Sequence, residues 1–166
     1  MTASCEHSHS GTRPCESEIA EALTMVEGRF VADGERMTAP RRRVLELLLA
    51  AAEPVKAYDL IARYGTDGQA AKPPTVYRAL EFLERQGVVH RIASISAYVA
   101  CTAEGGADGL SHAAAFLICD CCGATEEVAV AKLDAVSQAA IKAGYSIERT
   151  TIEGHGRCAD CQQGTA

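Results

Sequence analysis

Apolar residues recur every three or four positions in four segments of the first half of the chain, which predicts four helices. The first begins near Ser17 and stops before Gly34, and the second follows Thr38, a favourable N-cap residue. A short third helix is expected over residues 57–64, and a fourth over residues 75–86. The expected buried stripes are Ile19, Leu23, Val26 and Phe30, then Val44, Leu45, Leu48 and Leu49, then Val76, Leu80 and Leu83.

Two β-prone runs follow these helices, over residues 88–92 and 97–101, and a short turn of small residues joins them. Helices of this length followed by a hairpin are typical of a winged helix-turn-helix. The next segment, residues 102–111, is rich in Gly, Ala and Ser, which indicates a hinge between two domains.

Beyond the hinge the pattern predicts a small α/β domain of about 50 residues, near the lower limit for a core without a staple. Strands are expected over residues 116–119, 127–130 and 145–152, and a helix over 131–143 with Leu133, Val136, Ala140 and Ile141 inward. The fold class is therefore α+β. The predicted divisions are a disordered tail (1–16), a winged-helix domain (17–101), the hinge (102–111) and an α/β dimerisation and metal-binding domain (112–166).

The net charge of −6 over 166 residues argues, by itself, against binding to nucleic acid. Splitting the chain changes that interpretation, because residues 36–91 carry a net +4 between ends of −5 each. A solvated surface would also explain a modest excess of this kind. The amino terminus lacks a secretory core and the longest apolar run is too short to cross a bilayer, so we expect a cytoplasmic protein.

Eight cysteines in a reducing cytoplasm favour metal ligands or redox thiols over disulfides. Cys119-x-x-Cys122 and Cys158-x-x-Cys161 form two pairs, each able to present two thiolates to one tetrahedral ion. The 35 residues between the pairs hold the predicted strand, helix and strand, which can return the second pair beside the first. We favour a structural zinc; two redox motifs or two disulfides stay open. Both pairs are expected at strand ends, whereas a thiol oxidoreductase places its CxxC at a helix start.

A second set of potential ligands is more dispersed along the chain. His90 and Cys101 end the two strands of the predicted hairpin, and antiparallel pairing would bring them together. His112 follows the hinge and Glu127 opens a strand. Each residue has an ordinary structural explanation, but as a set the two imidazoles, the thiolate and the carboxylate suit Zn²⁺ by ligand type.

The start of the fourth predicted helix, PPTVYRAL at residues 73–80, has features of a DNA-recognition helix. Thr75, Tyr77 and Arg78 lie off the apolar stripe, and arginine can bind guanine O6 and N7 in a fork. An exposed arginine on an ordinary helix is the alternative. The run Arg41, Arg42 and Arg43 is expected to add phosphate contacts.

Together these motifs resemble the ferric uptake regulator family of bacterial metal-responsive repressors. The resemblance rests on TAPRRRVLELL at 38–48, PPTVYRALEFLERQGVVHRI at 73–92 and the two CxxC pairs, and it runs from about residue 17 to 162. It implies a homodimer, formed through the C-terminal domain, that binds a palindromic double-stranded DNA operator. It implies neither an enzyme, nor a membrane partner, nor a small-molecule substrate.

Within the family the chain is most similar to the zinc uptake regulator branch, through VVHRI, SAYVAC, SHAAAFLICDCCGATEE and EGHGRC. The sensor ligands of that branch fall on His90, Cys101, His112 and Glu127. The resemblance thus implies two zinc ions per chain, one structural and one regulatory, and repression of zinc-uptake genes when zinc at the hinge orders the dimer.

A sibling sensor of iron, manganese or peroxide is the nearest alternative, although the thiolate of Cys101 favours zinc on grounds of softness. A thiol oxidoreductase and a zinc-ribbon interaction module without DNA binding are less favoured. No role is assigned to His155, to Cys121, or to the N-terminal group Cys5, His7, His9 and Cys15.

Overall fold

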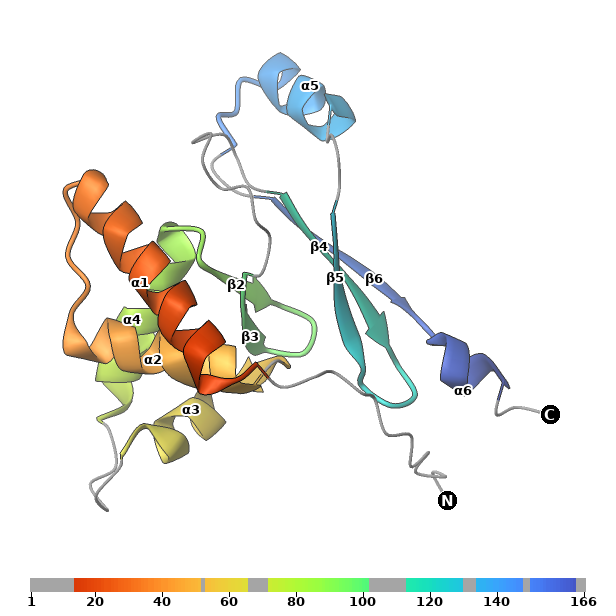
Figure 1. The fold of residues 1–166 in the computed structure, drawn as a ribbon. Coiled ribbons are helices and arrows are strands. Elements are labelled where there is room, and N and C mark those ends of the chain that lie inside the picture. Colours follow the sequence, from red (N-terminus) through yellow and green to blue (C-terminus); the bar gives the residue numbers. More distant parts are fainter. Residues whose placement is uncertain are drawn as a thin grey trace. The chain divides into compact units, whose positions relative to one another are not determined.

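The computed structural model describes residues 14–51, 53–65, 72–101, 113–129, 134–147 and 150–163 (Figure 1). The described residues form two compact units, residues 14–101 and residues 113–163, here called the N-terminal and C-terminal units. The predicted hinge and the first 13 residues of the predicted tail lie outside the described ranges. Within those ranges, no helix combines the length and the apolar character needed to span a membrane.

The N-terminal unit contains the four predicted helices and the predicted hairpin. Its three strands form one antiparallel sheet in the order β1-β3-β2. The two-residue strand β1 was not predicted, because so short a segment has no periodicity to detect. The elements are α1 (Glu16–Ala32), α2 (Ala39–Ala51), β1 (Val55–Lys56), α3 (Ala57–Tyr64), α4 (Pro73–Arg85), β2 (Val89–Ile92) and β3 (Ala97–Ala100).

The core of this unit is built from the predicted apolar stripes. Val44, Leu45 and Leu48 of α2 are buried, as are Val76, Leu80 and Leu83 of α4. Phe30 of α1 meets Phe82 of α4 edge to face, with ring centroids 5.3 Å apart. Burying one such side chain stabilises the fold by about 1.5–3 kcal/mol. Packing against α1 and α2 therefore holds α4 in place while another of its faces stays exposed.

A glycine cap connects α4 to the wing formed by β2 and β3. Gly87 has φ +69°, and its N–H donates to the carbonyl of Glu84 at 3.0 Å. The next N–H, of Val88, donates to Leu83 at 3.1 Å, which completes a Schellman motif. Since side chains rarely tolerate this φ, the glycine fixes where the recognition helix ends and the wing begins.

The C-terminal unit is an α/β structure whose three-stranded sheet has the order β5-β4-β6. β4 pairs antiparallel with β5 and parallel with β6. This mixed sheet, together with the winged helices, confirms the predicted α+β class. The elements are β4 (Ala113–Cys119), β5 (Thr125–Ala129), α5 (Asp134–Lys142), β6 (Thr150–Gly156) and α6 (Ala159–Gln163).

Three details of this unit differ from the predictions. The last strand covers Thr150–Gly156 rather than 145–152, because the parallel ladder with β4 overrides the poor β-propensity of the glycines in EGHG. The short helix α6 was not predicted. On α5, Val136 and Ile141 are 44% and 75% exposed rather than inward, since no other described element of the chain covers them.

We expect Leu83→Ala to lower the free energy of unfolding by about 2–5 kcal/mol, because Leu83 is fully buried and the cavity cannot close completely. The matched control is Val31→Ala on α1, a residue 76% exposed, which should change stability by less than about 0.5 kcal/mol. Urea unfolding followed by helical circular dichroism measures both. Equal losses would contradict this description of the core.

Candidate metal centres and DNA-binding surface

Four cysteines converge at one end of the C-terminal sheet. The sulfur atoms of Cys119, Cys122, Cys158 and Cys161 all lie within 4.8 Å of one another. Cys119 ends β4 and Cys122 lies in the turn after it, as predicted. The second pair is not at a strand end: Cys158 follows β6 by two residues and Cys161 lies within α6. None of the described cysteines forms a disulfide.

The parallel pairing of β4 with β6 explains why the two pairs meet. Parallel strands run in the same direction, so Cys119 at the end of β4 lies opposite Gly156 at the end of β6. The N–H of Asp120 then donates to the Gly156 carbonyl at 2.8 Å, which holds both chain segments together beyond the sheet. Gly123, at φ +77°, closes the first turn by donating to the Cys119 carbonyl at 2.8 Å.

The geometry of this cluster suits a tetrahedral ion. Zn–S bonds of about 2.3 Å in a tetrahedron place the sulfurs about 3.8 Å apart. The Sγ atoms of Cys122 and Cys158 are separated by 3.7 Å. Cys119 and Cys161 are buried and the other two half-buried, so the four donors enclose a position largely shielded from solvent.

The surroundings of the cluster shift the pKa values of two of its thiols in opposite directions. The backbone N–H groups of Cys122 and Cys158 hydrogen-bond the Cys119 sulfur and lower its pKa to about 6. That of Cys158 lies 3.3 Å from the sulfur. Burial raises the pKa of Cys161, and a cation bound beside the sulfur would favour its thiolate form.

The wing brings two further potential ligands together within the N-terminal unit. His90 pairs with Val99 in the β2–β3 ladder, and Cys101 lies two residues further on the same face. The N–H of Cys101 donates to the Val88 carbonyl at 3.0 Å, which continues the ladder. Ligand atoms of His90 and Cys101 lie within 4.8 Å of each other, as the hairpin predicted. His90 is 8% exposed, which is unusual for a histidine on a wing.

The other two predicted sensor residues belong to the second half of the chain. Glu127 lies on β5 opposite Phe116 of β4, and it is half-buried. His112 lies outside the described residues. The assignment of these four residues to one site therefore stays a prediction.

The recognition helix presents the polar residues that the sequence analysis selected. Tyr77 is 51% exposed, Arg78 is exposed and Thr75 is half-buried, whereas the neighbouring Val76 and Ala79 are buried. Tyr77 and Arg78 are therefore accessible to a partner. The Pro73 and Pro74 pair starts the helix directly ahead of them, a position where prolines cost no hydrogen bond.

The three arginines at the start of α2 are each engaged within the chain. The ion pairs of Arg42 and Arg43 are partly exposed and contribute little to stability, so a phosphate can compete for those two guanidinium groups. Their role as phosphate contacts stays a prediction. Arg41 lies over the Phe82 ring, with its guanidinium carbon 3.2 Å from the ring centroid. Arg42 pairs with the Glu27 carboxylate, and Arg43 pairs with the Glu46 carboxylate at 2.9 Å.

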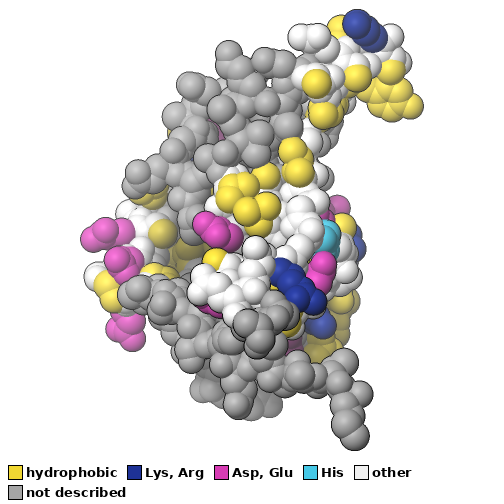
Figure 2. Space-filling view, turned by 90° about the vertical axis from the view of Figure 1, so that its right-hand side faces the viewer, with side chains coloured by type: hydrophobic (Ala, Val, Ile, Leu, Met, Phe, Trp, Pro, Cys, Tyr) yellow, Lys and Arg dark blue, Asp and Glu magenta, His cyan; other side chains and the backbone are white. Residues whose placement is uncertain are grey.

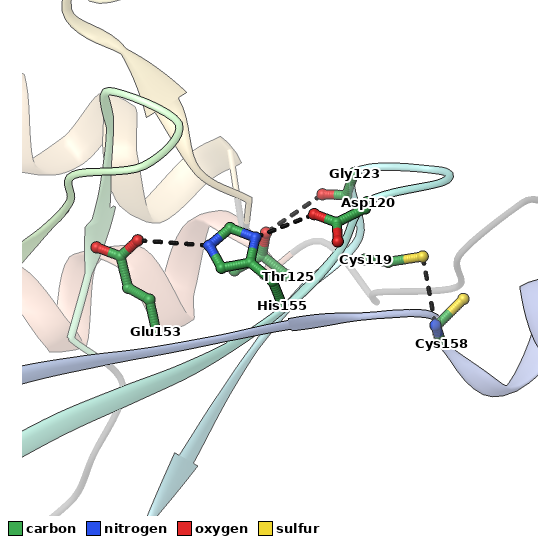
Figure 3. A network of polar contacts seen from close by, with 7 residues as sticks. All are labelled: Cys119, Asp120, Gly123, Thr125, Glu153, His155 and Cys158. Atoms are coloured by element: carbon green, nitrogen blue, oxygen red, sulfur yellow. Dashed lines mark hydrogen bonds and ion pairs between the residues drawn. The ribbon is translucent and has the colours of Figure 1, made fainter. Parts of the chain in front are cut away.

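A polar contact between two side chains lies beside the four cysteines. His155 of β6, which was left without a role, points its ring at Asp120 in the first cysteine turn (Figure 3). Its signal in the sequence is weak, since an aspartate between two cysteines and a histidine three residues before the next pair have no spacing rule of their own.

A winged-helix unit with an exposed recognition helix, joined to an α/β unit with a four-cysteine cluster, defines a metal-binding transcriptional regulator. The chain belongs to the ferric uptake regulator family: the sequence model of that family matches residues 32–155. It is accordingly a DNA-binding, metal-responsive regulator and not an enzyme, which excludes the thiol oxidoreductase.

Among individual proteins, the chain is 39% identical over 142 residues to the zinc uptake regulation protein of Escherichia coli (strain K12), covering 85% of this chain and 81% of that protein. It is 37% identical to a solved zinc uptake regulator complexed with zinc and DNA, with a TM-score of 0.76 over 88% of this chain and 96% of that one. The structure of holo XcZur gives 38% identity and a TM-score of 0.70, over 86% and 98%.

We expect Cys158→Ser to bind the ion of the four-cysteine cluster more than about 100-fold more weakly, since loss of a ligand exceeds the effect of changes outside the ligand set. Cys121→Ser is the matched control, because Cys121 is exposed and outside the group of four. Metal analysis after mild chelation should find the ion retained by wild type and Cys121→Ser only. Retention by Cys158→Ser would contradict the assignment.

Proposed function

We propose that this protein is a cytoplasmic, zinc-responsive repressor of zinc-uptake genes that binds a palindromic operator as a homodimer. The regulatory zinc is held by His90, Cys101, His112 and Glu127, and a second, structural zinc by the four-cysteine cluster. The observation that carries the proposal is the proximity of His90 and Cys101, which supplies an imidazole and a thiolate at one position on the wing. Its similarity to a zinc uptake regulation protein and to a regulator solved with zinc and DNA supports the zinc response and the DNA binding.

The chemistry of the proposed sensor favours zinc over the ions of sibling regulators. Two imidazoles, one thiolate and one carboxylate are ligands that Zn²⁺ accepts in a tetrahedral site. Fe²⁺ and Mn²⁺ prefer harder oxygen and nitrogen donors, so the Cys101 thiolate counts against them. Before the first cysteine pair the sequence reads SHAAA, with one histidine, and so lacks the histidine-rich run expected of an iron sensor.

DNA binding is assigned to the exposed side of α4. Arg78 can bind a guanine through both O6 and N7, and Tyr77 can pack against a thymine methyl or reach a phosphate. Thr75 and the arginines 41–43 would add contacts to the phosphate backbone of the DNA. The segment that holds these residues carries the net +4 of residues 36–91, which supplies the electrostatic attraction that DNA binding requires.

A second copy of the chain is the proposed cover for an exposed apolar surface of the C-terminal unit. Figure 2 shows hydrophobic side chains gathered on one face of the molecule. Large exposed apolar side chains of this kind mark an interaction surface, and the family forms its dimer through this domain. The residues are Leu117 and Ile152 on one face of the sheet, and Val136, Ile141 and Tyr145 on and after α5, between 37% and 75% exposed.

The switch would act through the distance between the two recognition helices of the dimer. A zinc ion bound by residues of the wing and of the C-terminal unit would tie each DNA-binding unit to the dimer. The helices must then match half-sites about 34 Å apart, one turn of DNA. A coupling of about 1–3 kcal/mol, or about 5–150-fold in affinity, is sufficient for regulation.

We expect Cys101→Ser to lose the zinc dependence of operator binding while keeping its weak zinc-free binding. The operator is first selected by the wild-type protein from random duplex DNA in buffered zinc, and binding of that duplex is then measured by fluorescence anisotropy against free Zn²⁺, Fe²⁺ and Mn²⁺. Cys15→Ser, which changes an exposed cysteine, is the control and should respond as wild type. An unchanged zinc response in Cys101→Ser would overturn the sensor, and stronger activation by Fe²⁺ or Mn²⁺ would overturn the choice of metal.

We expect Arg78→Ala to weaken binding of the selected duplex by about 1–3 kcal/mol and to relax the preference for one base pair. Lys142→Ala on α5 removes the same charge from the C-terminal unit and should leave base preference unchanged. Competition with duplexes substituted one position at a time measures both effects. A uniform loss across all sequences would make Arg78 a phosphate contact instead.

A further inference from the structure

The ring of His155 lies between two carboxylates beside the four-cysteine cluster (Figure 3). Its Nδ1 is 3.0 Å from Oδ1 of Asp120, and its Nε2 is 3.8 Å from Oε2 of Glu153. An ionised carboxylate only accepts hydrogen bonds, so Nδ1 donates to Asp120. The hydrogen bond to Asp120 orients the ring, whereas Nε2 lies beyond hydrogen-bond distance of Glu153.

This contact joins the two cysteine pairs outside the ligand set. Asp120 lies between the ligands Cys119 and Cys122, whereas His155 lies on β6 three residues before Cys158. Two hydrogen bonds donated by backbone N–H groups also join these segments, from Asp120 to the Gly156 carbonyl at 2.8 Å and from Cys158 to the Cys119 sulfur at 3.3 Å. The imidazole adds to them a link that a substitution can remove without touching the backbone.

We infer that His155 is a positioning residue for the structural zinc: by binding Asp120 it holds the first cysteine pair in place against the second. The inference rests on the proposed structural zinc. His155 itself is not a ligand in this arrangement, because it is absent from the cysteine group and its ring nitrogens face carboxylates. The contact restricts the two cysteine-bearing segments before the ion binds. They therefore lose less conformational entropy when they close around it.

The size of the effect follows from the exposure of the pair. Partners outside a ligand set typically change metal affinity by 10–100-fold, roughly, when they are removed. The side chains of His155 and Asp120 are 39% and 62% exposed, so solvent screens the contact. We therefore expect zinc to leave about tenfold faster when the contact is lost, the lower end of that range.

The test measures zinc release from the full chain to a chromophoric chelator, far below the unfolding temperature. All variants carry Cys101→Ser, so that the four-cysteine zinc is the ion observed. His155→Ala and Asp120→Ala should each release zinc about tenfold faster, and the double variant no faster than either, because one contact is lost in all three. His155→Asn keeps an N–H donor at the position of Nδ1 and should release zinc at nearly the parental rate.

The outcomes separate this inference from the proposed function. Release from His155→Ala at the parental rate would overturn the positioning role and leave the structural zinc intact. Equally fast release from His155→Asn and His155→Ala would also overturn it, since the hydrogen bond would not be the cause. A parent chain that holds no zinc after mild chelation would instead refute the structural zinc itself.

Discussion

The parallel pairing of β4 with β6 is the constraint on which the C-terminal unit depends. It places Cys119 and Gly156, which end the two strands and are 37 positions apart in the sequence, side by side at one end of the sheet. The segments that follow the two strands therefore lie close together, and a CxxC pair lies at the end of each strand or directly after it. A parallel connection needs a long crossover, which explains why the cysteine pairs are separated by far more residues than in a zinc ribbon.

The wing achieves a similar convergence by the opposite geometry. In the antiparallel β2–β3 pair the register His90↔Val99 makes Cys101 a diagonal neighbour of His90 on the same face. The Gly87 cap sets this register relative to α4, because the strand begins directly after the Schellman motif. The Gly87 cap thus connects the recognition helix directly to the face of the wing that carries His90 and Cys101, the two wing residues of the proposed sensor.

Local patterns in the sequence were sufficient to predict the four helices and the hairpin of the N-terminal unit, but not strand β1. The apolar spacing of α2 and α4 and the glycine after α4 act within one turn of chain, so Val44, Leu48, Leu80 and Leu83 were correctly expected in the core. The C-terminal unit was harder, because partners distant in sequence decide its structure. The ladder with β4 moved β6 onto the glycine-containing segment EGHG, and Ile141 is exposed because none of the described elements covers it.

The His155–Asp120 contact is invisible in sequence for the same reason, since it exists only through the parallel ladder. The cysteine cluster could be predicted because CxxC spacing is itself a local rule, whereas its electrostatics could not. Backbone N–H groups lower the pKa of Cys119 while burial raises that of Cys161, and both effects depend on how the turns pack.

The two proposed zinc sites differ in charge, and the difference fits their separate roles. Four thiolates around Zn²⁺ carry a net −2, and two of the four sulfurs are buried. Loss of the ion would leave buried thiolates without a counterion, which is costly, so the proposed structural site would hold its zinc tightly. One thiolate and one carboxylate with two neutral imidazoles balance Zn²⁺ to zero. A site without net charge need not be deeply buried. Its zinc can therefore bind and dissociate as the free zinc concentration changes.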